Sequence, residues 1–390
     1  MRTIVIFTFL LLGINLSAQE ISKDAKFYLM TCNEGDMVFE QFGHTGLRVY
    51  DPINQIDLVF NWGYFSFGDD PNAFMMKFAK GKLDYELAIG NSNGFFGTYQ
   101  HYNRTVWQSE LDLNEVQKHK LWNQLKDNWK EENRGYRYDF FLKNCATIVY
   151  DHINEATDGD LDLMTVDPDI QRTYRDYINI GFNDHPWTRF GINLVLGSPI
   201  DQKVDEQGMM FHPLYVDTLF MNSKFLSDGR PLIKERIVVF EGKKHTNENT
   251  AFLTPTKVTL FFLILSLVIG FFQWILAIRI FAGLYLFIIS ILGFLLLFMW
   301  FGTDHQTAAN NYNLLWANPI ILIFAVGVLK KDWMIKLSNV FYYTAGYFFF
   351  FILFFMMLPQ IFTMPIKIII MTEAFLFYFL HRRANVLAKQ

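Results

Sequence analysis

The chain has 390 residues, a formal net charge of −4 at pH 7 and a mean hydropathy of +0.15. Its length exceeds what one ordinary domain needs, and the averages conceal two different regions. Residues 258–390 carry three acidic and eight basic side chains, which leaves 35 acidic and 26 basic ones for residues 1–257. The acidic N-terminal region lacks the basic surface that nucleic acid binding needs, so we expect no nucleic acid partner.

The first 18 residues have the pattern of a secretion signal. Arg2 supplies the positive charge, residues 4–14 are apolar, and residues 16–18 form a small-residue cleavage site. We therefore expect residues 1–18 to be a signal peptide and the mature chain to begin at Gln19. An uncleaved anchor helix is the alternative. No cysteine follows this site, so nothing indicates that the protein is itself a lipoprotein.

The C-terminal region predicts an all-α membrane domain of about five transmembrane helices, since a spanning helix needs about 20 mostly apolar residues. The five apolar segments are residues 258–278, 280–301, 312–329, 339–358 and 360–380. Basic side chains lie at Arg279, in residues 330–336 and after residue 380, whereas the loop 302–312 has none. Because basic loops stay on the cytoplasmic side, we expect the N-terminal domain and the loop 302–312 on the outer side.

Residues 19–242 predict one soluble α+β domain, followed by a polar linker at residues 243–257. Alternating or β-rich segments indicate strands at residues 26–32, 44–50, 56–62, 83–89 and 105–111. A helix is expected after Asn114, because Gln117 three residues later completes a capping box. Its expected apolar stripe consists of Val116, Leu121, Leu125 and Trp129. A second helix is expected to begin at Cys145 and to end before residues 158–160.

Cys145 is the strongest candidate for chemistry, in the segment Asn144-Cys145-Ala146-Thr147. A thiol at a helix N-terminus faces unpaired backbone N–H groups and the positive end of the helix dipole, and both favour the nucleophilic thiolate. The same N–H groups can hold an oxyanion. The alternative is a small buried hydrophobic residue. The other cysteine is Cys32, and a disulfide between the two is less favoured than a free, working Cys145.

His44 is the candidate base, in Phe42-Gly43-His44-Thr45-Gly46 at the start of a predicted strand. A nucleophilic thiol needs a base within hydrogen-bond reach, and that base needs an orienting group. Asn61, on the next predicted strand, can orient His44 if the two strands pair. The alternatives are a structural strand histidine and a strand-end turn residue. No cluster has metal-ligand spacing, so we expect neither a metal nor a cofactor.

Further residues are candidates for substrate binding. Arg48 shares the alternating face of His44 and could bind a phosphate, although its position favours a solvated strand arginine. Tyr138, Asp139 and Asn144 directly precede Cys145 and either shape the pocket or pack and cap. His305 lies in the polar outer loop, which could meet lipid headgroups or the soluble domain; a plain hydrophilic loop is the alternative. Glu373 lies within a predicted span, and such residues are functional candidates by default.

Several motifs together resemble the Lnb family of lipoprotein N-acyltransferases. They are Phe27-Tyr-Leu-Met-Thr-Cys32, Phe42-Gly-His-Thr-Gly-Leu-Arg-Val49, Val59-Phe-Asn-Trp-Gly63, Tyr136-Arg-Tyr-Asp139 and Asn144-Cys-Ala-Thr147. A later stretch, Leu196-Gly-Ser-Pro-Ile-Asp201 with Phe211-His-Pro-Leu214, also fits, as does a multi-span C-terminus. The order and spacing of these motifs carry the resemblance, which covers nearly the whole chain.

The resemblance implies a permuted papain-like (NlpC-type) periplasmic domain, in which the His strand precedes the Cys helix. It implies a multi-pass protein of the inner (cytoplasmic) membrane. The implied reaction is thiol-dependent acyl transfer: Cys145 takes an acyl chain from a phospholipid donor and passes it to the amine of a diacylated lipoprotein. Fold alone does not fix the reaction. A membrane-tethered cell-wall cysteine amidase or peptidase, and a non-catalytic periplasmic binding module on a membrane scaffold, remain open.

Overall fold

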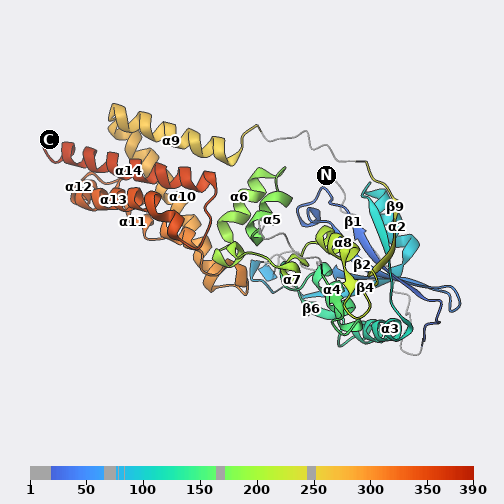
Figure 1. The fold of residues 1–390 in the computed structure, drawn as a ribbon. Coiled ribbons are helices and arrows are strands. Elements are labelled where there is room, and N and C mark those ends of the chain that lie inside the picture. Colours follow the sequence, from blue (N-terminus) through green and yellow to red (C-terminus); the bar gives the residue numbers. More distant parts are fainter. Residues whose placement is uncertain (1–18, 66–75, 78, 83, 164–171, 244–251) are drawn as a thin grey trace. The chain divides into compact units, whose positions relative to one another are not determined.

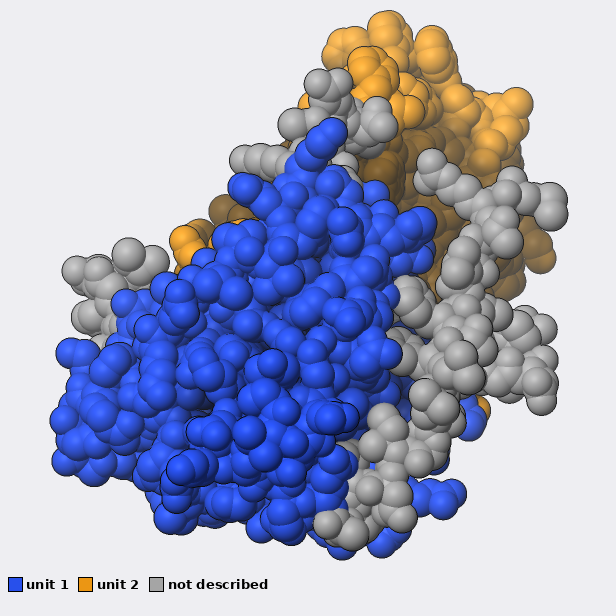
Figure 2. Space-filling model, turned by 90° about the vertical axis from the view of Figure 1, so that its right-hand side faces the viewer, with its two compact units in different colours: residues 1–78, 82–171, 204–246 blue, residues 79–81, 172–203, 247–390 orange. Residues whose placement is uncertain are grey.

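A computed structural model describes residues 19–65, 76–77, 79–82, 84–163, 172–243 and 252–390 (Figure 1). The predicted signal peptide and residues 244–251 of the predicted linker lie outside the described residues. The chain divides into two compact units (Figure 2). Unit 1 comprises residues 1–78, 82–171 and 204–246, and unit 2 comprises residues 79–81, 172–203 and 247–390. Residues 172–203, which the sequence assigned to the soluble domain, thus pack with the C-terminal helices.

Unit 1 is built on a seven-stranded antiparallel sheet with the strand order β6-β4-β3-β2-β1-β5-β9. The strands are β1 (Lys26–Cys32), β2 (His44–Asp51), β3 (Ile56–Tyr64), β4 (Asp84–Asn91), β5 (Val106–Leu111), β6 (Gly135–Arg137) and β9 (Ile233–Phe240). The five predicted strands are confirmed to within two residues at each end. The sequence did not indicate β6 and β9, which form the two edges of the sheet.

Strand alternation sends side chains to two differently covered faces. On one face, Phe60 and Trp62 of β3 pack edge-on or tilted against Trp122 of α3 (Glu115–Trp129) and His152 of α4 (Cys145–Ala156). The opposite face meets α2 (Ser92–His101), which the sequence did not predict. There the buried residues are Met30, Cys32, Val59, Phe95, Tyr99 and Val106. His44 and Asn61 alternate onto this second face.

The helix α3 begins as predicted, with Asn114 accepting from the Gln117 N–H and Gln117 bonding back in a capping box. Its predicted apolar stripe is partly wrong. Leu121 and Leu125 are fully buried, but Val116 is 76% exposed and Trp122 fills the core in its place. The stripe is therefore rotated by about one residue, because the large indole buries more apolar area than a valine in the first turn.

Unit 1 also contains short elements between these. They are η1 (Val38–Glu40), α7 (Glu206–Met209), α8 (Pro213–Asn222), and the two-stranded pair β7 (Leu161–Asp162) and β8 (Lys224–Phe225). Unit 2 begins with α5 (Tyr174–Gly181), α6 (Pro186–Val195) and η3 (Ser198–Asp201).

Four helices of unit 2 are long and apolar enough to cross a membrane, among the residues that the structure describes. They are α9 (Pro255–Phe272), α10 (Ile275–Phe301), α13 (Ser338–Phe354) with η6 (Phe355–Met357), and α14 (Met364–Leu387). The first predicted boundary, at Arg279, is wrong. The break lies at Gln273, whose φ of 57° is left-handed, and Arg279 belongs to α10.

The predicted third span, residues 312–329, is not one helix. It consists of η5 (Tyr312–Leu315) and α11 (Ile321–Gly327), with α12 (Lys331–Lys336) after them. Pro319 interrupts it because proline has no N–H to donate and its ring excludes the preceding turn. The segment still follows α10 in the reverse direction: Gly293 lies against Ala317 and Pro319, and Arg279 donates to the Val328 carbonyl. The chain thus traverses much of the helical block here as a broken element.

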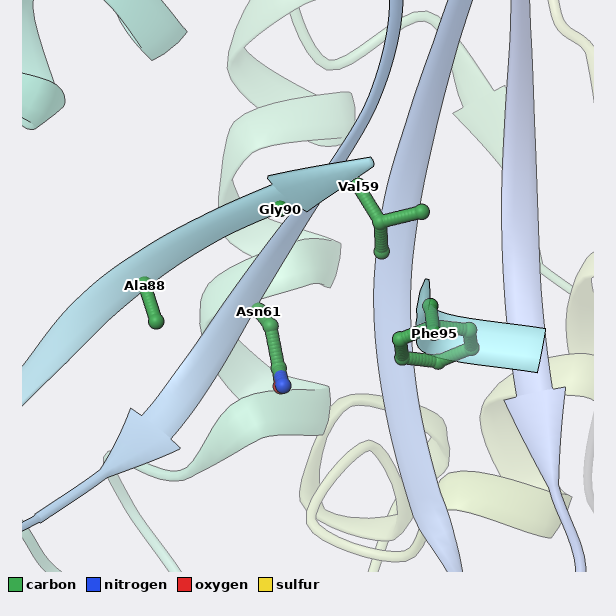
Figure 3. A pocket seen from close by; sticks show the side chains of 5 residues that line it. All are labelled: Val59, Asn61, Ala88, Gly90 and Phe95. Carbon is green, nitrogen blue, oxygen red and sulfur yellow. The ribbon is translucent and has the colours of Figure 1, made fainter. Parts of the chain in front are cut away.

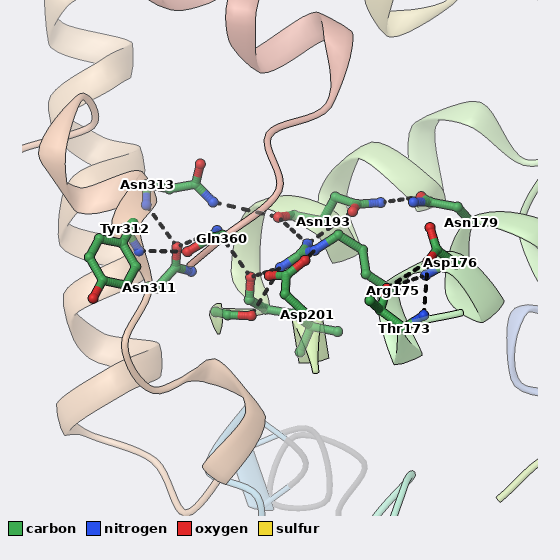
Figure 4. A network of polar contacts seen from close by, with 12 residues as sticks. Thr173, Arg175, Asp176, Asn179, Asn193, Asp201, Asn311, Tyr312, Asn313 and Gln360 are labelled. Atoms are coloured by element: carbon green, nitrogen blue, oxygen red, sulfur yellow. Dashed lines mark hydrogen bonds and ion pairs between the residues drawn. The ribbon is translucent and has the colours of Figure 1, made fainter. Parts of the chain in front are cut away.

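A buried polar network ties residues 172–203 to this helical block (Figure 4). Arg175 is fully buried and donates to Asp201 from Nε at 2.7 Å and from Nη2 at 2.9 Å. Its Nη1 donates to the side chain of Asn193. Asn311 donates to the carbonyl oxygens of residues 194 and 195, and Gln360 accepts from the N–H of residue 312. These bonds satisfy polar groups that would otherwise be buried without partners.

Candidate active site

Cys145 lies at the first position of α4, held there by its neighbour Asn144. The Asn144 Oδ1 accepts from the N–H groups of Ala146 and Thr147 at 2.8 and 3.0 Å. Its amide donates to the carbonyl oxygens of Phe140 and Phe211. All hydrogen-bonding capacity of the Asn144 amide is therefore spent on fixing the helix start, which makes Asn144 a structural cap and leaves the thiol free to react.

Three backbone N–H groups face the Cys145 thiol: those of Thr45, Ala146 and Cys145 itself. The predicted helix N-terminus effect is present, since these groups lower the thiol pKa. Burial outweighs them and raises the pKa of Cys145 to about 11. The expected resting thiolate is therefore not what the structure favours: the thiol is protonated at neutral pH.

His44 and Asn61 meet as predicted. The Nε2 of His44 contacts the Oδ1 of Asn61, and β2 pairs with β3 as a neighbour. A carbonyl oxygen only accepts, so Nε2 carries the proton and Nδ1 is the basic nitrogen. Burial lowers the pKa of His44 to about 4; the Asn61 bond opposes this change and Arg104 reinforces it. His44 is thus neutral at neutral pH, with Nδ1 able to accept a proton.

The thiol and the imidazole are joined through one peptide unit. Thr45 directly follows His44, and its N–H faces the thiol. Thr45 precedes Leu47, where the pairing of β2 with β3 begins. The start of β2 therefore brings the peptide between His44 and Thr45 against the Cys145 thiol, while the His44 side chain contacts Asn61.

A buried layer beside His44 was missed by sequence reasoning. The Tyr99 ring stacks on the His44 ring at 6.4 Å with an interplanar angle of 15°. The Tyr99 hydroxyl hydrogen-bonds the thiol of Cys32, and burial raises the pKa of Cys32 to about 12. Both cysteines are free, and Cys32 is fully buried whereas Cys145 is partly accessible. Cys32 thus belongs to the core, and Cys145 is the more accessible of the two thiols.

Tyr138 and Asp139 take different roles beside Cys145. Tyr138 stacks on Tyr85 at 4.4 Å and interacts electrostatically with the Cys145 thiol. Asp139 Oδ1 accepts from the N–H groups of Phe141 and Leu142, which shapes the loop before α4. Tyr138 therefore lines the surroundings of the thiol, while Asp139 supports the loop.

A small apolar pocket opens beside Asn61 (Figure 3). Val59, Ala88, Gly90 and Phe95 line it with Asn61. Asn61 is the single polar side chain in this lining, and its other contact is His44. The pocket therefore gives the orienting residue an apolar setting on the α2 side of the sheet.

Two other predicted substrate-binding residues lie elsewhere. The guanidinium of Arg48 is bonded to Asp57 from Nε and Nη2 and to Gln108 from Nη1, at 2.6 to 2.9 Å. Asp57 already neutralises the charge of Arg48. A phosphate-binding role for Arg48 stays a prediction. His305 belongs to unit 2, where its backbone lies beside Gly81. Glu373 is fully buried in α14, and neither carboxyl oxygen has a hydrogen-bond partner among the described residues.

The fold defines a class: a protein with a mixed α/β domain, which carries the His44–Asn61 contact and Cys145 at a helix start, and a C-terminal part with four candidate membrane spans. Comparison with known families narrows this. Residues 17–179 match the family described as the Lnb N-terminal periplasmic domain, and residues 247–383 match the Lnb transmembrane domain. The chain belongs to the Lnb family, whose domains mark membrane proteins of lipoprotein biogenesis. No curated protein and no solved structure shows a significant match.

Proposed function

We propose that this protein is a lipoprotein N-acyltransferase of the inner membrane that works through a thioester on Cys145. The observation that carries the proposal is the partly accessible thiol at the start of α4, with three N–H groups around it and a neutral histidine one peptide away. Family membership and the four candidate spans support a substrate pair that resides in a membrane. The relation to permuted papain-like enzymes is part of this proposal.

In the first half-reaction, the Cys145 sulfur attacks the carbonyl carbon of a phospholipid ester while Nδ1 of His44 takes the thiol proton. The carbonyl oxygen becomes an oxyanion, and the N–H groups of Thr45 and Cys145 are suited to stabilise it, whereas the Ala146 N–H already donates to Asn144. The C–O ester bond then breaks. The leaving alkoxide takes the proton from His44 and departs as a lysophospholipid, which leaves the acyl chain on the sulfur.

In the second half-reaction, the α-amine of a diacylglyceryl-cysteine lipoprotein attacks the thioester carbonyl. His44 takes a proton from the attacking amine, the C–S bond breaks, and the sulfur regains a proton to regenerate the thiol. The product is an N-acylated lipoprotein. Both half-reactions use the same nucleophile, base and N–H groups, so no cofactor is required.

The full reaction tests the proposal. The purified chain is incubated with a phospholipid labelled in its acyl chain and with a diacylated lipopeptide, and N-acylation is followed by mass spectrometry. The wild type is expected to transfer the label, and Cys145→Ala to transfer none. Transfer by Cys145→Ala at the wild-type rate would refute the covalent step. Cleavage of cell-wall peptides without lipopeptide acylation would favour the amidase instead.

A further inference from the structure

Arg104 is a buried cation beside the site that the proposed mechanism does not use. It is 6% exposed and lies just before β5. Its Nε and Nη2 donate to the carbonyl oxygen of Asn33 at 2.9 and 2.7 Å, and its Nη1 donates to Glu40 at 3.0 Å. A guanidinium is buried at high cost, so a protein retains one where its partners and its position serve a purpose.

The position of Arg104 links it to the base. Its Cζ lies 4.9 Å from the centroid of the Tyr99 ring. Tyr99 in turn stacks on the imidazole of His44 at 6.4 Å. Tyr99 therefore lies between the guanidinium of Arg104 and the imidazole of His44, and each of the two packs against its ring.

The same arginine holds the backbone that leads into His44. Asn33 directly follows β1, and Glu40 belongs to η1, so the two partners lie on the loop between β1 and β2. That loop ends at Gly43, with a φ of 78°, where an added Cβ would lie 2.4 Å from the Cys32 carbonyl oxygen. The path into His44 is thus tightly confined, and Arg104 fixes it from inside the domain.

We infer that Arg104 is a positioning residue of the Cys145–His44 pair: it orients His44 through Tyr99 and supplies the positive charge that favours the thiolate of Cys145. The inference deepens the proposed function, because it assumes that these two residues are the reacting pair. It adds a residue whose charge, and not its contact with substrate, contributes to the reaction.

The charges around the pair set the sign of the effect. Arg104 lowers the pKa of both Cys145 and His44, since a nearby cation favours a thiolate and disfavours an imidazolium. The other titratable groups that face the pair are Cys32 on β1, Tyr99 on α2, Tyr136 on β6, Tyr138 directly after β6, and Glu40 as the partner of Arg104. The cysteine and the three tyrosines carry no positive charge in either protonation state. Arg104 is therefore the positive charge that lies near the pair in this set.

The test measures the ionisation of Cys145 directly. The full chain is alkylated with iodoacetamide across a range of pH, and modification at Cys145 is quantified by mass spectrometry. In Arg104→Gln, the midpoint of the rate–pH curve is expected to rise by about one pH unit, as loss of a charge several ångströms away implies. Arg104→Lys retains the charge and is expected to stay closer to the wild type.

Glu40→Gln is the matched control variant, which changes the charge in the opposite direction to Arg104→Gln. It keeps the cation but removes the anion that offsets it, so the midpoint is expected to fall. A purely structural role would move both variants in the same direction, through loosening of the loop that they share. Opposite shifts therefore support the inference. Shifts of the same sign, or an unchanged midpoint in Arg104→Gln that retains a cooperative thermal transition, overturn it.

Loss of folding is covered by the double variant Arg104→Gln with Glu40→Gln, which leaves no uncompensated charge. Its midpoint is expected near the wild-type value, and a rise as large as in Arg104→Gln alone would contradict the charge argument. The assay needs neither phospholipid nor lipopeptide. If the shifts appear while no acyl transfer occurs, the proposed function fails and the inference about Arg104 stands. If acyl transfer occurs while the shifts are absent, the inference about Arg104 fails and the proposed function stands.

Discussion

At the scale of single residues, the site rests as two neutral groups. Burial holds the pKa of Cys145 at about 11 and that of His44 at about 4, so neither an ion pair nor a free thiolate is the resting state at pH 7. Proton transfer from sulfur to Nδ1 must then accompany the attack on the ester. This makes the orientation of the imidazole decisive, because a general base acts only within hydrogen-bond reach of the proton that it takes.

Asn61 Oδ1 contacts Nε2 of His44, and we propose that this contact fixes the orientation, so its removal is the first prediction. In Asn61→Ala, the rate of acyl transfer is expected to fall roughly 10- to 100-fold, since a misplaced catalytic group costs about that much. The thermal transition is expected to change little, because Asn61 is only half-buried. Single-turnover measurement of thioester formation checks the rate. A full wild-type rate would show that Asn61 does not orient His44.

At the scale of elements, much of the site follows from local sequence. The alternation of residues 44–50 predicts β2, and Asn144 before Cys145 predicts the start of α4. The pairing of β2 with β3 then brings Asn61 to His44. Arg104 and Tyr99 could not be found this way. They reach the site from α2 and the following loop, across the sheet, and no spacing rule links them to Cys145.

In the membrane elements, too, sequence patterns predict only part of the structure. Hydropathy locates apolar segments, but the ends of α9 and α10 depend on one left-handed residue, Gln273, which has no distinctive signal. The segment 312–329 is apolar enough for a helix yet contains Pro319. Its irregular backbone is tolerated because Trp316 and Ala317 are fully buried inside the helical block.

The buried pair of Arg175 and Asp201 provides a prediction for unit 2. Arg175→Met leaves Asp201 without its partner, which is expected to destabilise the fold by about 3–5 kcal/mol. The double variant Arg175→Met with Asp201→Leu replaces both charges and is expected to recover most of that loss. Thermal melting of the purified chain checks both. Equal destabilisation in the single and double variants would show that the ion pair itself is not the cause.

At the scale of the whole molecule, three histidines with lowered pKa values make unit 1 sensitive to acid. The pKa values of His44, His152 and His212 are each lowered from 6.5 to about 4 by burial. Above pH 6.5 they are neutral in both folded and unfolded chains and have no effect on stability. Below it, the unfolded chain binds protons that the folded chain does not, so the free energy of unfolding falls as the pH drops toward 4.

The expected loss is at most about 3 kcal/mol for each histidine by pH 4, as a shift of 2.5 pKa units implies. Thermal melts of the chain between pH 7.5 and 4 measure it. His152→Gln removes one of the three groups and is expected to flatten the decline. A melting temperature that stays constant from pH 7 to 4.5 would contradict the burial of neutral histidines.

The membrane topology is the second prediction at this scale. Because residues 312–329 run back along α10, the helical block contains four candidate spanning helices and one broken crossing. With an odd number of crossings and basic residues after position 380, we expect the C-terminus in the cytoplasm. A C-terminal fusion to a reporter active only in the cytoplasm is expected to be active. Activity of a reporter specific to the periplasm would contradict this path.

The proposed mechanism requires that an acyl group becomes attached to the Cys145 sulfur. The full chain is incubated with phospholipid in the absence of lipopeptide, digested and mapped by mass spectrometry. A mass increase equal to one acyl chain is expected on the peptide that contains Cys145, removable by hydroxylamine, and absent from Cys32 and from a His44→Ala variant. If Cys145 stays unmodified and the same protein then acylates added lipopeptide, the thioester mechanism is contradicted.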